Sequence, residues 1–245
     1  MNVSNGEDNT EKSLFALVCG RVQQWKGPDV LCKAFSHLNE AIPNINWIGR
    51  DTYYTENATK TQHLTVEFPE IWNKKIIHAA SLENQKMLAL QSKSKFGIVA
   101  STWDMFNFTG VEFLSQGVPV ICSDNAGCSS LIINGFNGFK YKNNDPIELA
   151  NRLQMANKLT DEEYKSMCKA ALSTVKINLS ATTTINSNLA MYASLSNNGQ
   201  EIKRNLFLNN IFEPSEDQYS FDATLDRQPL KQILKYISKR IKNKL

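Results

Sequence analysis

Residues 101–127 read STWDMFNFTGVEFLSQGVPVICSDNAG, and their order of loops and apolar runs sets the expected fold. An apolar run at 96–100 precedes them, with the length and β-branched content of a buried strand. A polar loop follows, then apolar residues recur at helical spacing around Val111, and a second buried strand begins at Val118. Another polar loop fills 123–127. In a parallel sheet both loops lie at the carboxyl ends of their strands, so we expect them side by side at a ligand site.

The same alternation of strand and helix continues through most of the chain. Apolar runs predict strands at 14–19, 45–48, 75–78, 96–100, 118–121 and 138–141. Helical spacing and capping residues predict helices at 29–38, 59–66, 82–90, 111–114, 129–133, 145–153, 161–175 and 184–196. The pattern predicts an α/β fold with a doubly wound, Rossmann-like parallel sheet of about six strands and extra C-terminal helices. One connection, 52–72, is unusually long and has no function assigned from the sequence.

Composition narrows the class of protein. The chain has 245 residues, of which 42% are hydrophobic and 21% charged, as in ordinary globular proteins. Its net charge of +3 includes 24 acidic residues and argues against a dedicated nucleic-acid binder. Five cysteines without C-x-x-C spacing indicate neither a zinc site nor a disulfide framework, so we expect buried thiols in a reducing compartment. With a polar start and no apolar run near the ~20 residues of a membrane span, a cytoplasmic location is expected.

The loop after the first strand carries two cations. Residues 20–28 read GRVQQWKGP, with Arg21 and Lys26 five positions apart and a helix expected next. Gly20 lets the chain turn away from the strand tip, and the helix N-terminus adds partial positive charge. Such a loop suits a diphosphate. Taken alone, the loop is more often just two solvated cations on a surface, and its coincidence with the acidic loop at 101–110 favours binding.

The acidic loop carries a resemblance to a known family. Asp104, seven further residues, Glu112 near a helix start and then the turn GVPV at 117–120 are similar to the signature of retaining glycosyltransferases of family 4, or glycosyl transferases group 1. The similarity lies in the C-terminal, donor-binding half of the GT-B fold and covers 14–153. In that family both acids are usually glutamates, whereas the first one here is the shorter Asp104.

The resemblance implies roles for individual residues. Arg21 and Lys26 would bind the donor's phosphates, Glu112 would accept hydrogen bonds from two ribose hydroxyls, and Asp104 would face the sugar. Gly110 would let the backbone approach the ligand. The candidate catalytic residues are Arg21, Lys26, Asp104 and Glu112. The candidate donor-binding residues are Gly20, Arg21, Lys26, Asp104, Phe106, Asn107, Phe108, Thr109, Gly110 and Glu112.

The expected chemistry uses no metal and no cofactor, with a nucleotide-diphosphate sugar as substrate. The sequence lacks an Asp-x-Asp motif, and Arg21, Lys26 and backbone N–H groups around 109–110 could stabilise the departing diphosphate instead. Retention of configuration, with the leaving phosphate taking the acceptor's proton, is implied by the resemblance alone.

GT-B enzymes have two such domains, and the N-terminal acceptor-binding domain is missing from this sequence. We therefore expect the donor half of an enzyme that transfers a hexose to a glycan or lipid-linked acceptor, together with that domain or a partner chain. One alternative is a non-catalytic nucleotide-sugar-binding or assembly subunit. Another is an unrelated nucleotide binder, which predicts a glycine-rich fingerprint after the first strand, and GRVQ at 20–23 is not one.

The remaining segments are assigned from composition. We expect a flexible leader at 1–12, the nucleotide-sugar-binding domain at 13–197 and a linker at 198–229. Residues 230–245, LKQILKYISKRIKNKL, form a basic amphipathic pattern without an acidic residue. It could lie on an anionic membrane at the inner face, or pack on this domain or on a partner domain.

Overall fold

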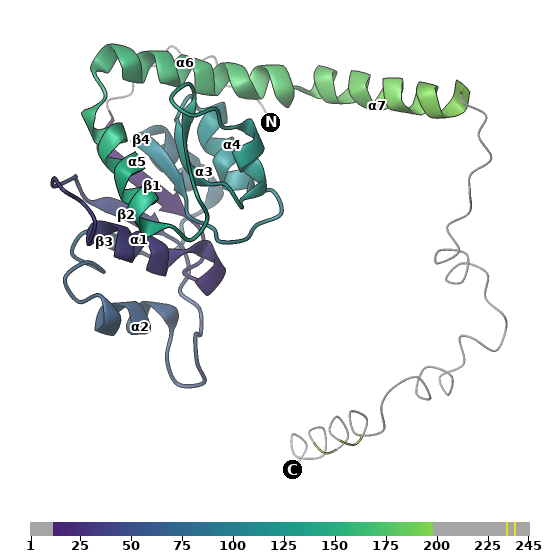
Figure 1. Cartoon of the computed structure of the whole chain (residues 1–245). Coiled ribbons are helices and arrows are strands. Elements are labelled where there is room, and N and C mark those ends of the chain that lie inside the picture. The colour runs from purple at the N-terminus through teal and green to yellow at the C-terminus, as the bar shows by residue number, and fades with distance from the viewer. Residues whose placement is uncertain (1–11, 198–233, 235–237, 239–245) are drawn as a thin grey trace. The chain divides into compact units, whose positions relative to one another are not determined.

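The computed structural model describes residues 12–197, Leu234 and Ser238. Its centre is a six-stranded parallel sheet with the order β3-β2-β1-β4-β5-β6, which confirms the predicted fold class (Figure 1). The strands are β1 (Leu14–Cys19), β2 (Ile45–Ile48), β3 (Ile76–Ala79), β4 (Ser94–Val99), β5 (Val120–Ser123) and β6 (Gly138–Tyr141). The strand order reverses between β1 and β4, and in such sheets ligands bind outside the carboxyl ends of the strands at that point.

Helices cover both faces of the sheet (Figure 1). The helices in the described part of the chain are α1 (Pro28–Phe35), α2 (Lys60–Glu67), α3 (Asn84–Ser92), α4 (Phe108–Ser115), α5 (Pro146–Lys158), α6 (Asp161–Asn178) and α7 (Ala181–Asn197), with short 3-10 helices η1 (Gln24–Lys26) and η2 (Gly127–Leu131). No helix in the described part of the chain is long and apolar enough to cross a bilayer.

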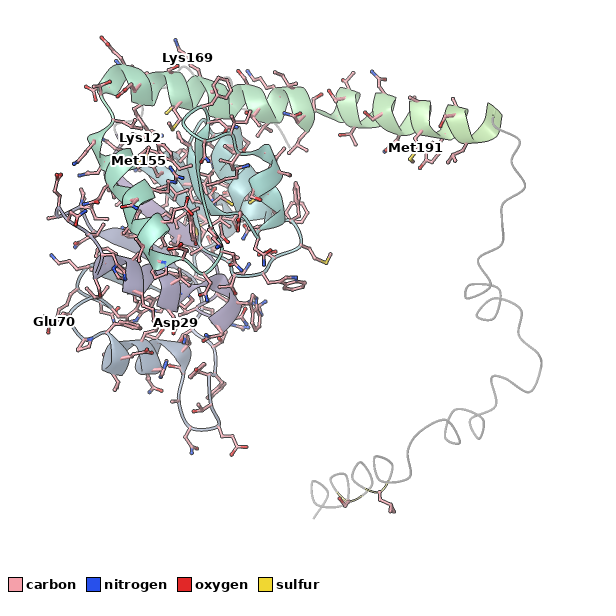
Figure 2. The ribbon with its side chains drawn as sticks, in the orientation of Figure 1. Lys12, Asp29, Glu70, Met155, Lys169 and Met191 are labelled. Atoms are coloured by element: carbon pink, nitrogen blue, oxygen red, sulfur yellow. The ribbon has the colours of Figure 1, made fainter. Side chains whose placement is uncertain are left out.

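Alternation along β1 divides the core into two apolar clusters (Figure 2). Ala16 and Val18 face a cluster that includes Leu31 of α1 and Leu153 of α5. Leu17 faces the opposite cluster, which includes residues of α4 and α6. Successive residues of a strand point to opposite faces, so burial on both sides explains why this strand reads as a continuous apolar run.

Local capping fixes where the later helices begin. The Asp145 side chain accepts hydrogen bonds from the backbone N–H groups of Ile147 and Glu148 at 3.0 and 2.9 Å, with Pro146 in the first turn of α5. This agrees with the start predicted from the Asp-Pro pair. Helix α5 runs five residues past the predicted end at 153, because Ala156 is still buried against the core.

The predicted helix at 129–133 is wrong in type and position. The structure has the 3-10 helix η2 there, in which the N–H groups of Ser129 and Ile132 bond to carbonyls three residues back. Helix α1 ends at Phe35 rather than 38 because the N–H groups of Ser36 and His37 also bond three residues back. The other predicted elements agree in type, with bounds within three residues.

The chain divides into two compact units, 1–187 and 188–245. Of the second unit, the structure describes the end of α7, Leu234 and Ser238, and the last two are helical. The predicted leader, apart from residue 12, and the linker at 198–229 lie outside the described residues. The same holds for the rest of the predicted helix at 230–245.

Candidate functional site

A narrow crevice with a volume of only about 10 Å³ lies at the carboxyl ends of β1 and β4, where the strand order reverses. Cys19, Gly20 and Lys26 line it from the β1 side, and Ser101 and Asn107 line it from the β4 side. The Trp47 indole donates a hydrogen bond of 2.9 Å to the Gly20 carbonyl and so fixes the backbone at the tip of β1. Two loops far apart in the sequence therefore meet at the place expected for a ligand.

The two loops are joined by an ion pair. Lys26 Nζ lies 2.5 Å from Asp104 Oδ2, and the two side chains are 25% and 19% exposed. The same carboxylate oxygen accepts hydrogen bonds from Asn107 Nδ2 at 3.0 Å and from Ser101 Oγ at 3.5 Å. Backbone contacts add to the link, because the Thr102 N–H donates to the Trp25 carbonyl at 2.8 Å. Asp104 is thus held in one position by three donors.

Asn107 connects the acidic loop to the start of α4. Its backbone has φ = 62°, in the left-handed region that asparagine tolerates better than most residues. Its side-chain carbonyl accepts a hydrogen bond from the Gly110 N–H at 3.3 Å, which caps the helix. The N-terminal end of α4, with its partial positive charge, therefore lies beside Asp104.

The polar loop after β5 packs along the acidic loop, as predicted. Asp104 and Ala126 form a parallel bridge, and the Gly127 N–H donates to the Asp104 carbonyl at 3.0 Å. Asn125 Nδ2 donates to the Thr102 carbonyl at 2.7 Å. These contacts hold the acidic loop against the loop that follows β5.

Glu112 lies in the second turn of α4, not in the first turn as predicted, because Asn107 starts the helix at Phe108. Gln91 of α3, which is fully buried, donates a hydrogen bond of 3.1 Å to Glu112 Oε2. Burial, and to a smaller extent the Glu112 carboxylate, raises the pKa of the Cys19 thiol to about 12. Cys19 ends β1 and directly precedes the loop that carries Arg21. Glu112 therefore lies near that end of the strand.

Comparison with known proteins identifies the family. The family model for glycosyl transferases group 1 matches residues 3–173. The chain belongs to this family. This confirms the resemblance drawn from Asp104, Glu112 and the turn that follows them.

Individual relatives of this glycosyltransferase chain are distant in sequence. A D-inositol 3-phosphate glycosyltransferase of Xylanimonas cellulosilytica is 26% identical over 140 residues, which is 56% of this chain and 32% of that protein. Anabaena HepE in complex with UDP superposes with a TM-score of 0.62 at 19% identity, covering 74% of this chain and 49% of HepE. The C-terminal domain of Francisella tularensis LpcC, a glycosyl transferase group 1 protein, gives 0.58 at 16% identity, covering 68% of this chain and 87% of that domain.

The glycosyltransferase chain spans about a third of the Xylanimonas protein and about half of HepE. It covers most of the LpcC C-terminal domain. The fold described above is thus the one found in the C-terminal half of group 1 enzymes.

Gly110 has a packing role in addition to its predicted role toward the ligand, which stays a prediction. A Cβ at this position would lie 2.7 Å from Cys128 Sγ and 3.5 Å from Val99. Gly110 is buried, and a side chain there would strike η2 and β4. Close packing of α4 against the sheet requires the glycine.

Of the predicted donor-binding residues, Gly20, Lys26 and Asn107 line the crevice, and the remaining ones differ in exposure. Phe108 is 67% exposed, and its ring contacts Phe106 edge to face with 5.5 Å between centroids. Arg21 is exposed, while Thr109 is half-buried on the first turn of α4. Their assigned roles toward a donor remain predictions.

Sequence reasoning missed two features of this candidate site. Gln91 supports Glu112 and also accepts a hydrogen bond of 2.8 Å from Gln116 Nε2. Its only signal in the sequence is a polar residue at a buried helical position. The loops that follow β1 and β4 also carry exposed apolar side chains, among them Trp25, Trp103 and Met105 at 45, 63 and 82% exposure. Each was interpreted only as part of a loop.

Proposed function

We propose that the crevice binds the diphosphate sugar donor of a retaining, metal-independent glycosyl transfer. The observation that carries this proposal is the meeting of Lys26 and Asp104 across the point where the strand order reverses. A cation for a phosphate and an acid for sugar hydroxyls then stand within one ligand's reach. Anabaena HepE, which shares the fold, was crystallised with UDP, and this supports a nucleotide as the ligand.

In the proposed reaction the bond between the sugar and the diphosphate breaks, and negative charge grows on the leaving phosphate. Arg21, Lys26 and the N-terminal end of α4 stabilise that charge without a metal ion. The leaving phosphate takes the proton of the acceptor hydroxyl, which attacks from the same face so that configuration is retained. Glu112, held by Gln91, accepts hydrogen bonds from the ribose.

The acceptor side is a further part of the proposal. A hexose would pass to a glycan or lipid-linked acceptor held by an N-terminal domain or a partner chain, in cytoplasmic polysaccharide assembly. The basic sequence at 230–245 would bring the enzyme to an anionic membrane surface. Equal pelleting with anionic liposomes by chains with and without 229–245 would contradict this last point.

A thermal-shift screen with UDP, GDP and ADP tests the donor assignment. We expect one of the three nucleotides to raise the melting temperature of the wild type, because a ligand that binds only the folded state stabilises it. The double variant Arg21→Ala with Lys26→Ala should lose that shift. Lys33→Ala, which removes an exposed cation of α1, is the matched control and should keep it. No shift with any nucleotide would count against the proposal.

A further inference from the structure

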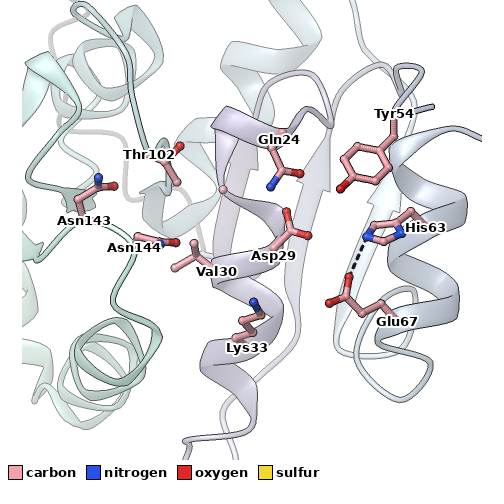
Figure 3. A pocket seen from close by; sticks show the side chains of 11 residues that line it. Gln24, Asp29, Val30, Lys33, Tyr54, His63, Glu67, Thr102, Asn143 and Asn144 are labelled. Atoms are coloured by element: carbon pink, nitrogen blue, oxygen red, sulfur yellow. Dashed lines mark ion pairs between the residues drawn. The ribbon is translucent and has the colours of Figure 1, made fainter. Parts of the chain in front are cut away.

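A second pocket, of about 640 Å³, lies between α1 and the long connection 52–72 (Figure 3). Its lining includes Gln24, Asp29, Lys33, Tyr54, His63 and Glu67. The connection has no role in the donor site as proposed. It nevertheless places an imidazole and a carboxylate of α2 opposite the carboxylate of Asp29, as Figure 3 shows.

Three of these side chains converge. Asp29, His63 and Glu67 each offer one potential ligand atom, and these atoms lie within 4.8 Å of one another. His63 and Glu67 are four residues apart on α2, so they project from one face of the helix, and His63 Nε2 is 2.8 Å from Glu67 Oε2. One imidazole with two carboxylates is a donor set that zinc accepts.

Asp29 is oriented toward this point by a buried cation. Lys60 is 1% exposed, and its ammonium donates to Asp29 Oδ1 at 2.7 Å and to Gln24 Oε1 at 2.8 Å. The other carboxylate oxygen, Oδ2, is buried and has no hydrogen-bond partner among the described residues. An unpaired buried acceptor destabilises the fold, and a cation bound at Oδ2 would remove that cost.

The imidazole is also held in place. His63 stacks on the Tyr54 ring with 4.5 Å between centroids and 27° between planes. Lys60 Nζ lies 4.1 Å from the centroid of the same Tyr54 ring. Lys60 therefore orients Asp29, and Tyr54 holds His63, as supporting residues do in established metal sites.

We propose that Asp29, His63 and Glu67 bind a transition-metal dication of the zinc class, which clamps α2 to the first turn of α1. Asp29 then bridges Lys60 through one oxygen and the metal through the other. The two carboxylates and Lys60 together carry a net charge of −1, which a bound dication would change to +1. Mg²⁺ and Ca²⁺ favour sites made of oxygen ligands and are expected to bind poorly beside an imidazole.

Equilibrium dialysis of the chelator-treated chain against Zn²⁺, with elemental analysis of the bound metal, tests this site. We expect one high-affinity ion per wild-type chain. His63→Gln and Glu67→Gln should each weaken that binding by about tenfold or more, since loss of outer partners alone changes metal affinity by roughly 10- to 100-fold. His37→Gln, which changes an exposed histidine outside the pocket, is the matched control and should bind as the wild type does.

Zinc bound by the free cysteines would also be counted in the dialysis experiment. Thermal unfolding therefore gives a second readout that does not count bound metal. Zn²⁺ should raise the melting temperature of the wild type and of His37→Gln, but not of His63→Gln or Glu67→Gln, and Mg²⁺ should have no effect. The proposal would be overturned if both α2 variants still bound the zinc ion and were stabilised by it. So would a wild type that binds no zinc.

Discussion

Lys26 Nζ and Asp104 Oδ2 lie 2.5 Å apart, so the loops that follow β1 and β4 are joined by a charge pair at the reversal of the strand order. Each side chain is less than a third exposed, which reduces screening by water. Each charge also orients the other before a ligand arrives. A bound phosphate would share Lys26 with Asp104, and the proposed donor site therefore has its polar groups already positioned.

The stability of this link can be measured with a double-mutant cycle. Lys26→Met and Asp104→Asn should each lower the free energy of unfolding by about 1 kcal/mol, near the upper end for exposed pairs. In urea denaturation the double variant should lose less than the sum of the two, because either change breaks the same pair. Glu162→Gln, an exposed acid on α6, should change stability little. Strict additivity would show that the pair contributes nothing.

The Glu112 carboxylate should control donor affinity. A charge-assisted hydrogen bond contributes ~1.5 to 3 kcal/mol. Glu112→Ala should therefore weaken binding of the nucleotide selected by the thermal-shift screen by about ten- to a hundredfold, as measured by calorimetry. An unchanged affinity would remove Glu112 from the donor site.

Gln91 should act through Glu112. Gln91→Leu removes the donor to Oε2 and leaves the Gln116 amide without this acceptor, so both stability and nucleotide affinity should fall. Gln85→Leu makes the same change at an exposed position of the same helix and should leave affinity unchanged. If Gln91→Leu lowered stability but not affinity, its role would be confined to packing.

Gly110 should be required for packing against Cys128. Gly110→Ala places a Cβ 2.7 Å from Cys128 Sγ, and overpacking of this kind costs roughly 1–3 kcal/mol. Adding Cys128→Ala removes the sulfur and should restore part of the lost stability in urea denaturation. If Cys128→Ala lowered the free energy of unfolding as much in Gly110→Ala as it does in the wild type, the contact with the sulfur would not be the cause.

Stability should fall as the pH rises above 9. The Cys19 thiol has a pKa raised from 9.0 to about 12 by burial, so the unfolded chain loses this proton at a lower pH than the folded chain does. The stabilising contribution is complete below pH 9 and is lost between 9 and 12. Cys19→Ser should make the free energy of unfolding less steep across that window. An unchanged slope would contradict the raised pKa.

The sequence predicted the sheet because its strands are short apolar runs bounded by polar loops, and burial on both faces produces that pattern. It also predicted that the loops around Lys26 and Asp104 would meet, since parallel strands bring their carboxyl ends to one edge. Their direct pairing was not predicted. Each side chain had been assigned to a ligand, and side-chain contacts between distant loops leave no trace in spacing.

Other parts of the two sites depend on tertiary packing alone. The support of Glu112 by Gln91 needs α3 and α4 to lie side by side, and neither residue signals the other in the sequence. Asp29 and His63 are likewise brought together only when α2 folds beside α1. The packing role of Gly110 was not predicted because the position of Cys128 behind α4 is a property of the fold.

Crystals of the chain soaked with UDP-glucose test the central claim most directly. We predict a diphosphate bound in the crevice beside Arg21 and Lys26, with the ribose on Glu112 and the sugar toward Asp104. A nucleotide bound elsewhere, such as between α1 and α2, with the Lys26–Asp104 crevice left empty, would contradict the account.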